Sequence, residues 1–294
     1  EKYFSPEKLV PYLGTRGCYW GKCTFCDHGA GYIDQFRAKH AEQIVDELEY
    51  LKNKLNAKHF MFTDESFPPA LFIKLPPMMV ERDLGISWTT LIRFESQLLD
   101  PKLWDMAHKS GCRSLYYGLE SANERIIKLV KKDTDIKAAK INLEQAKRVG
   151  IWSHVMCFYG FPSETPEEAE DTRQFLIQNQ DMIPSVEMYF FVLYKSAPVM
   201  FQTEEYKIKV KENPEHDLAL DFYYTPDSGQ TTEEAMARYE DFYRNDFDPW
   251  ALRINAREHV LLYITHFGTS DLPDLYVKNH REAHESNLAP EVML

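Results

Sequence analysis

The sequence is poor in cysteine, in long apolar runs and in basic residues, and each shortage excludes a class of protein. Only five cysteines occur among 294 residues, and three of them lie within positions 18–26, so a secreted disulfide framework is excluded. This distribution indicates a clustered metal site in a reducing compartment. We therefore expect a cytoplasmic protein.

The other two shortages exclude a membrane span and nucleic acid. The most apolar strip, residues 188–193, has only the length of a strand, and no basic start followed by an apolar stretch marks a signal peptide. Lys and Arg total 34 against 46 Asp and Glu, and the formal net charge of −12 disfavours nucleic acid as the main partner. The chain opens at Glu1 without a Met, so we expect further sequence upstream.

Strand-like and helix-like segments alternate along the first two thirds of the chain. Strands are predicted at residues 8–15, 58–64, 86–93, 113–119, 151–159 and 186–194, and helices at residues 40–55, 67–82, 101–110, 123–131, 136–149 and 166–181. This order favours an α/β fold with a parallel sheet, either curled toward a barrel or doubly wound. In both cases the chemistry belongs at the carboxyl ends of the strands.

The pattern changes after residue 195. Residues 232–244 and 255–266 are predicted to be helical, and the first of these helices follows a Thr-Thr-Glu-Glu start that is typical of a capping box. We therefore expect residues 1–195 to form the main domain. Residues 196–294 are expected to form a mostly helical extension that covers this domain and contributes to the substrate site.

Three cysteines lie in a glycine-containing loop after the first predicted strand. Cys18, Cys23 and Cys26 have the spacing C-x4-C-x2-C. Three thiolates on one loop can ligate three irons of a cubane cluster and leave the fourth iron open to a substrate. The alternative is a tetrahedral zinc site, in which His28 would be the fourth ligand.

This loop resembles the cluster-binding loop of the radical S-adenosylmethionine (SAM) superfamily, whose usual spacing is C-x3-C-x2-C with an aromatic residue before the last cysteine. Phe25 occupies the aromatic position, which in the family sets the backbone against the adenine of SAM, and the first spacing is one residue longer here. The Thr-Arg-Gly that precedes Cys18 resembles the opening of the cobalamin-dependent branch. The resemblance covers residues 8–195 and implies a partial (βα)6 TIM-like barrel.

Motifs at two further strand ends strengthen the resemblance. The segment F-T-D-E-S-F contains Asp64 and Glu65, and we expect Asp64 in first place and Glu65 in second place to accept the ammonium group of SAM. A helix N-cap is the structural alternative for Asp64. Arg93 ends the third predicted strand and is expected to pair with the SAM carboxylate or with Glu120.

The fourth and fifth predicted strands also end in motifs that resemble the superfamily's. G-L-E-S implies contacts of Glu120 and Ser121 with the ribose hydroxyls or the ammonium group of SAM. The turn G-F-P-S-E-T differs from the family's G-x-P-G-E-T by one serine, and it implies that Gly160 and Pro162 lie against the adenine.

The resemblance implies an enzyme whose [4Fe-4S] cluster cleaves SAM reductively to a 5′-deoxyadenosyl radical that abstracts a substrate hydrogen. The cobalamin-dependent branch implies C-methylation or a related rearrangement of a natural product, peptide or lipid, with a small-molecule or peptide substrate and an external electron donor of the flavodoxin or ferredoxin type. No D-x-H-x-x-G cobalamin motif occurs in the chain, so either a cobalamin domain precedes Glu1 or the protein works without cobalamin.

Two other functions remain open from the sequence. One is a redox-inert zinc-binding module, and the other is a degenerate barrel that binds SAM without cleaving it. Cys112 and Cys157 are interpreted as small buried hydrophobic residues. No second set of cysteines is then available for an auxiliary cluster.

Overall fold

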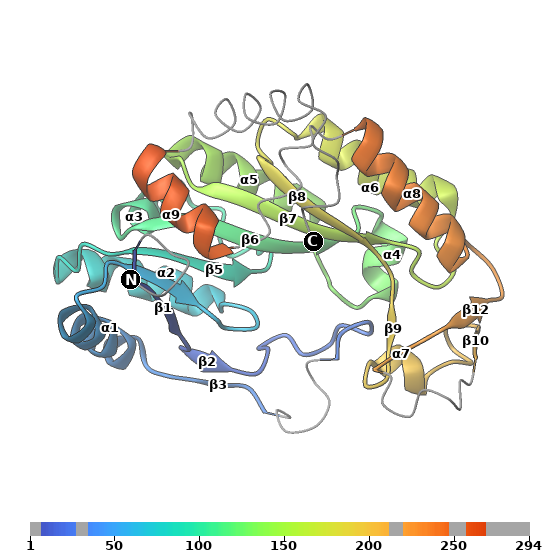
Figure 1. Ribbon diagram of the computed structural model, residues 1–294, viewed down its shortest axis with the longest axis horizontal. Coiled ribbons are helices and arrows are strands. Elements are labelled where there is room, and N and C mark those ends of the chain that lie inside the picture. Colours follow the sequence, from blue (N-terminus) through green and yellow to red (C-terminus); the bar gives the residue numbers. More distant parts are fainter. Residues whose placement is uncertain (1–6, 28–34, 212–219, 247–256, 269–294) are drawn as a thin grey trace.

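The computed structural model describes residues 7–27, 35–211, 220–246 and 257–268 (Figure 1). Its centre is a parallel sheet of six strands in the order β1-β4-β5-β6-β7-β8. The strands are β1 (Leu9–Tyr12), β4 (His59–Phe62), β5 (Ser87–Ile92), β6 (Cys112–Glu120), β7 (Trp152–Tyr159) and β8 (Ser185–Phe190). Each strand pairs with its successor in this series, so the predicted partial (βα)6 barrel is confirmed.

Helices in the connections between these strands form the outer layer. They are α1 (Ala41–Leu55), α2 (Pro69–Glu81), α3 (Pro101–Lys109), α4 (Glu124–Leu129), α5 (Ile136–Val149) and α6 (Pro166–Gln178). Figure 1 shows α2, α3, α5 and α6 along the far side of the sheet. Large aromatic side chains fill the space between the layers: the ring of Phe72 lies 5.4 Å from that of Trp104 and 6.3 Å from that of Trp88. Such rings each bury a large apolar area, and they fix α2 and α3 against the sheet.

Local signals explain why the helix boundaries were predictable. Asp100 and Asp135 accept hydrogen bonds from backbone N–H groups at the starts of α3 and α5. Thr165 and Glu168 form a reciprocal capping box at the start of α6. Gly150 adopts the left-handed conformation that ends α5.

A pair of short strands closes the base of the cysteine loop. β2 (Thr15–Arg16) pairs antiparallel with β3 (Arg37–Ala38), so Thr15 lies opposite Ala38. The N–H of Lys39 also donates to the carbonyl of Gly14 over 3.0 Å. The loop that carries the cysteines therefore leaves and rejoins the barrel at one place.

The described residues after β8 form short strands and three helices. These elements are β9 (Leu193–Tyr194), α7 (Pro198–Phe201), β10 (Ile208–Val210), β11 (Asp221–Phe222), β12 (Tyr224–Pro226), α8 (Thr232–Asn245) and α9 (Arg257–Phe267). β9 pairs with β11 and β10 with β12, both antiparallel. Both long helices agree closely with the predicted ranges. The short strands were not predicted, because two- or three-residue strands show no periodicity.

The two long helices of the extension lie against different parts of the barrel. α8 packs on β7 and β8, where it continues the outer helical layer beside α6 (Figure 1). The Tyr243 hydroxyl accepts from the N–H of Met188 and donates to its carbonyl, both over 2.9 Å, and so occupies backbone groups of the edge strand β8. α9 contacts β4, β5 and β6, and its Val260 and Ile264 pack on Trp152, the first residue of β7.

α9 therefore lies near the amino ends of the strands, away from the cysteine loop. Within the described residues, none of the helices has both the length and the apolar character that crossing a membrane requires.

Candidate functional site

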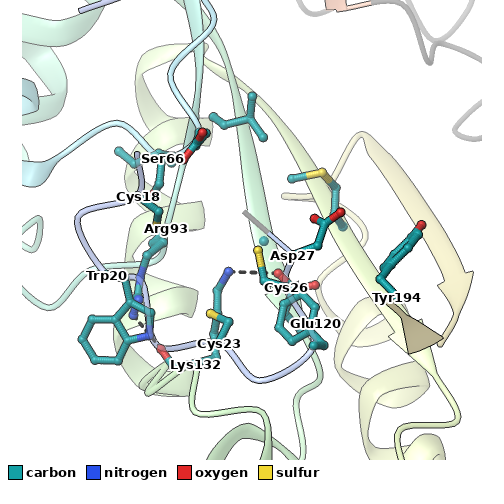
Figure 2. Close-up of a pocket in the computed structure, with 16 residues that line it drawn as sticks. Cys18, Trp20, Cys23, Cys26, Asp27, Ser66, Arg93, Glu120, Lys132 and Tyr194 are labelled. Atoms are coloured by element: carbon teal, nitrogen blue, oxygen red, sulfur yellow. Dashed lines mark hydrogen bonds and ion pairs between the residues drawn. The ribbon is translucent and has the colours of Figure 1, made fainter. Parts of the chain in front are cut away.

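All three clustered cysteines line one cavity at the carboxyl ends of the central strands (Figure 2). The cavity measures about 440 Å³, within the usual range for a small-molecule site. Its walls are Cys18, Trp20, Cys23, Phe25, Cys26, Asp27, Glu65, Ser66, Leu91, Ile92, Arg93, Gly118, Glu120, Lys132, Met156 and Tyr194. The last residue comes from β9, which follows β8 within residues 1–195.

Thr24 anchors the cysteine loop from within. Its side chain is almost fully buried, its N–H donates to the carbonyl of Val130 over 3.0 Å, and its hydroxyl donates to the carbonyl of Leu129 over 3.1 Å. Its own carbonyl accepts from the N–H of Val199 in α7 over 3.0 Å. These bonds hold the segment between Cys23 and Cys26 against both the end of α4 and the extension.

The two adjacent carboxylates after β4 point in different directions. Asp64 is fully buried and accepts from the Thr15 hydroxyl over 2.5 Å and from the N–H of Gly14 over 3.4 Å. Burial raises the pKa of Asp64, and the hydrogen bonds from Thr15 and Gly14 oppose that shift. Asp64 does not line the cavity and is not the N-cap of α2, which is Pro68. It anchors the base of the cysteine loop.

Glu65 is the carboxylate that faces the cavity. Its Oε2 is buried and has no hydrogen-bond partner among the described residues. A buried carboxylate oxygen without a donor is costly unless a ligand supplies one. The position of Glu65 therefore suits a cationic group bound in the cavity.

Arg93 provides the complementary charge. Its side chain is buried and donates from Nη2 to the carbonyl of Lys132 over 2.6 Å, while Nε lies 3.3 Å from Oε1 of Glu95. Its Nη1 is buried and has no hydrogen-bond partner among the described residues. Among the described residues, the cavity thus holds an acceptor on Glu65 and a donor on Arg93 that lack partners, as the ammonium and carboxylate groups of an amino acid would require, and the Ser66 hydroxyl there is also unpartnered.

Glu120 meets a lysine that the motifs did not indicate. Lys132 Nζ lies 2.9 Å from Glu120 Oε1, and the two side chains are only 10% and 12% exposed (Figure 2). Burial lowers the pKa of Lys132, but the charges of Glu120 and Cys23 outweigh it, so the pKa is raised. Burial also raises the pKa of the Cys23 thiol, and Lys132 opposes that shift. Lys132 follows α4, and no strand-end motif marks it.

Phe25 lines the cavity and packs on a second group of aromatic residues. Its ring centroid lies 5.0 Å from that of Phe158, at an interplanar angle of 61°. The same group contains Phe161, Phe191 and Tyr224, so it joins the turn after β7 to the extension.

The remaining predicted contacts lie outside the cavity lining. Ser121 is fully buried, and its hydroxyl lies 3.0 Å from that of Thr172 in α6. Gly160, at φ 82°, donates to Glu164 over 2.5 Å and accepts from the Tyr224 hydroxyl over 3.0 Å. Pro162 is buried in the same turn. In this arrangement these residues hold the strand ends and the extension together.

The cysteines are not arranged around a single ion. Among the described residues, no three His, Cys, Asp or Glu side chains converge as the ligands of one metal would. A tetrahedral zinc site needs four ligand atoms at about 2.0–2.3 Å from the metal. His28, the proposed fourth zinc ligand, lies outside the described residues. Three thiols that share a cavity without converging fit a cluster, in which each thiolate ligates a different iron.

Cys112 and Cys157 are fully buried, and burial raises the pKa of both thiols. Neither lines the cavity. Their position agrees with the interpretation of both as small buried hydrophobic residues.

A family model and several curated relatives match this chain. The model of the Radical SAM superfamily matches residues 12–176, more than half of the chain. A bacteriochlorophyllide d C-12(1)-methyltransferase of Chlorobaculum tepidum is 29% identical over 212 residues, which are 69% of this chain and 44% of the relative. An anaerobic magnesium-protoporphyrin IX monomethyl ester cyclase of Rubrivivax gelatinosus is 26% identical over 239 residues, 79% of this chain and 41% of the relative. The chain thus spans less than half the length of these relatives.

A solved structure shares the fold. The radical S-adenosylmethionine methyltransferase TsrM of Kitasatospora setae, with cobalamin and a [4Fe-4S] cluster bound, superposes with a TM-score of 0.70 at 16% identity. The alignment covers 94% of this chain and 61% of that protein. At this identity the similarity establishes the fold.

Proposed function

Because this chain belongs to the radical SAM superfamily, we propose that Cys18, Cys23 and Cys26 hold a [4Fe-4S] cluster and that the adjoining cavity binds SAM. When bound, the cluster supplies the electron that cleaves SAM to methionine and a 5′-deoxyadenosyl radical, which abstracts a substrate hydrogen. One observation carries the proposal: the three thiols share a cavity with a buried carboxylate oxygen and a buried guanidinium nitrogen, neither of which has a hydrogen-bond partner in the described part of the chain.

The two unpartnered groups bind the amino acid part of SAM in this proposal. Glu65 accepts from the ammonium group, and Arg93 Nη1 donates to the carboxylate. Asp64 accepts from Thr15 and Gly14 and lies outside the cavity lining, so it positions the loop without touching the ligand. We assign the Glu120–Lys132 pair, which lines the same cavity, to the ribose, with Glu120 accepting from a hydroxyl.

The adenine lies on the side of Phe25. The Phe25 ring forms a wall there, and its contact with Phe158 ties the loop to the turn that contains Gly160 and Pro162. Ser121 supports the same region from behind through Thr172. The protein's part is to orient SAM and to exclude water from a reactive radical.

We further propose that the reaction is a C-methylation and that it uses cobalamin. The support is that relatives of this chain are named as methyltransferases and that TsrM, which shares the fold, has been solved with cobalamin bound. A small-molecule or peptide substrate then enters past Tyr194 and Asp27, which line the cavity away from Ser66 and Arg93 (Figure 2). An external donor of the flavodoxin or ferredoxin type supplies the electron in a reducing, cytoplasmic setting.

The first test is an assay of SAM cleavage. The protein is reconstituted anaerobically with iron and sulfide and given SAM and dithionite, and 5′-deoxyadenosine is measured by mass spectrometry. We expect product from the wild type and none from Cys18→Ala, Cys23→Ala or Cys26→Ala. An assembled cluster that binds SAM without yielding product would indicate a degenerate barrel. Stoichiometric zinc without a cluster would refute the proposal.

A second assay separates methyl transfer from hydrogen abstraction alone. SAM with a trideuterated methyl group is supplied together with hydroxocobalamin and reductant. Labelled methylcobalamin would support the methyltransferase proposal. Its absence, with 5′-deoxyadenosine still formed, would restrict the function to radical generation without cobalamin.

A further inference from the structure

We propose that Trp20 is a positioning residue that holds the guanidinium group of Arg93 ready for the carboxylate of SAM. The inference rests on the proposed function, because it assigns Arg93 to that carboxylate. Arg93 Cζ lies 3.9 Å from the centroid of the Trp20 ring, and both side chains line the cavity (Figure 2). This is a short cation–π contact at a site where the cation is buried.

Both side chains of this contact donate hydrogen bonds to neighbouring backbone carbonyls. Trp20 Nε1 donates to the carbonyl of Lys131 over 2.8 Å, and Arg93 Nη2 donates to the carbonyl of Lys132 over 2.6 Å. Adjacent peptide groups therefore fix the indole and the guanidinium relative to each other. A rigid pair of this kind loses little side-chain entropy when a ligand arrives.

The aromatic ring stabilises the charge of Arg93 without using its donors. A buried guanidinium group needs compensation, and a second carboxylate would supply it but would also occupy the N–H groups. The face of Trp20 attracts the cation through its quadrupole and leaves the planar edge open. Nη1 has no hydrogen-bond partner among the described residues, so one donor is kept for a ligand.

The unusual cysteine spacing explains why Trp20 reaches this place. Four residues separate Cys18 from Cys23, and Gly21 among them has φ 59°, a turn that favours glycine. The turn presents two aromatic residues to the same region: Trp20 to Arg93, and Tyr19, whose hydroxyl donates to Glu95. The longer loop therefore brings Trp20 to Arg93 and Tyr19 to Glu95. Its length does not indicate that the motif has lost its function.

The test measures SAM affinity by calorimetry on the protein with its cluster reconstituted. We expect Trp20→Leu to weaken SAM binding about tenfold, which corresponds to about 1.4 kcal/mol. Trp20→Phe keeps an aromatic face, so its affinity for SAM should stay within about threefold of the wild-type value. Decarboxylated SAM lacks only the group that Arg93 binds, so the affinity for this ligand should fall less than about twofold in Trp20→Leu. Equal losses for the two ligands would overturn the inference, because a loop that is merely loosened affects both.

A double-mutant cycle supplies the second readout. If Trp20 acts through Arg93, Trp20→Leu should weaken SAM binding much less in an Arg93→Met background than in the wild type. If Trp20→Leu reduced SAM affinity by the same factor in both backgrounds, the inference would be overturned. Tyr50→Leu, which removes an exposed aromatic ring 5.1 Å from Lys54 Nζ, is the matched control and should leave affinity unchanged. Iron content confirms that each variant holds its cluster, and a wild type that neither binds nor cleaves SAM refutes the proposed function itself.

Discussion

Lys132 and Glu120 meet in a space that exists because residue 118 has no side chain. A Cβ atom at Gly118 would lie 2.5 Å from Glu120 Oε1 and 2.8 Å from Lys132 Nζ, both closer than real Cβ contacts allow. Glu120 also has φ 66°, an uncommon conformation for a residue other than glycine. Strained backbone of this kind gathers at functional sites, where the surrounding contacts maintain it.

Gly118→Ala should therefore damage the site more than the fold. The added methyl group pushes the two charged ends apart, so Glu120 and Lys132 no longer present one arrangement to the ligand. We expect SAM affinity to fall about tenfold, or about 1.4 kcal/mol. Calorimetry on the cluster-loaded protein measures this. Unchanged affinity would show that the ion pair has no part in binding.

Substitutions at Asp64 and Glu65 should have different effects, one on stability and the other on SAM binding. Glu65→Gln removes the negative charge that faces the cavity, so SAM binding should weaken while the cluster and the stability are retained. Asp64→Asn replaces one of the two oxygens that accept from Thr15 and Gly14 with an NH2 group, and should lower the free energy of unfolding by about 1–3 kcal/mol. Urea unfolding and calorimetry on both variants check this. The reverse assignment, with Asp64→Asn stable but unable to bind SAM, would show that Asp64 contacts the ligand.

Glu164 should make stability depend on pH. Burial raises the pKa of Glu164 to about 8, although the hydrogen bond from Gly160 opposes the shift. In the unfolded chain the pKa is near 4.5, so the folded state holds an extra proton between these values. The stability that this proton contributes is lost as pH rises through about 8, by at most about 1.4 kcal/mol per pH unit.

Glu164→Gln cannot ionise and should lose less stability than the wild type between pH 6 and pH 9. Urea unfolding of both proteins across that range gives the comparison. Parallel curves would show that Glu164 is already charged at pH 6. Glu167→Gln is a suitable control, since that side chain is exposed and its pKa is lowered by local hydrogen bonds.

Tyr243→Phe should weaken the edge of the sheet. The variant keeps the ring but loses the hydroxyl that bonds both backbone groups of Met188. We expect a loss of about 1–2 kcal/mol in the free energy of unfolding, from two hydrogen bonds to a partly buried strand. Faster amide hydrogen exchange at Met188 would report the local opening. Unchanged exchange would show that water replaces the hydroxyl at no cost.

Much of this structure could be predicted because the signals are local. Periodicity marks the strands and long helices, and residues such as Asp100 and Asp135 cap the helices they precede. The strand-end motifs could be expected to meet because the carboxyl ends of parallel strands lie at one edge of a sheet. Hence Cys18, Glu65 and Arg93 share one cavity although they are far apart in the sequence.

The parts that could not be predicted depend on the path of the backbone between elements. Which of Asp64 and Glu65 turns inward is decided by the irregular segment after β4, not by a strand's alternation. Lys132 reaches Glu120 only because α4 brings the chain back over the cavity. The contact of Trp20 with Arg93 needs the exact course of the longer cysteine loop, which spacing alone does not describe.

The antiparallel β2–β3 pair also bears on how readily a cofactor can be installed. Thr15 and Ala38 hold the two ends of the cysteine loop together through strand pairing, which does not depend on iron. Pairing at the base of the loop already includes most of the entropic cost of bringing the two loop ends together. That cost grows only with the logarithm of loop length. Iron insertion then has to order only the few residues around Cys18, Cys23 and Cys26, and not a whole loop whose ends are apart. The apoprotein should thus be a ready acceptor for cluster assembly and for reassembly after oxygen has destroyed the cluster.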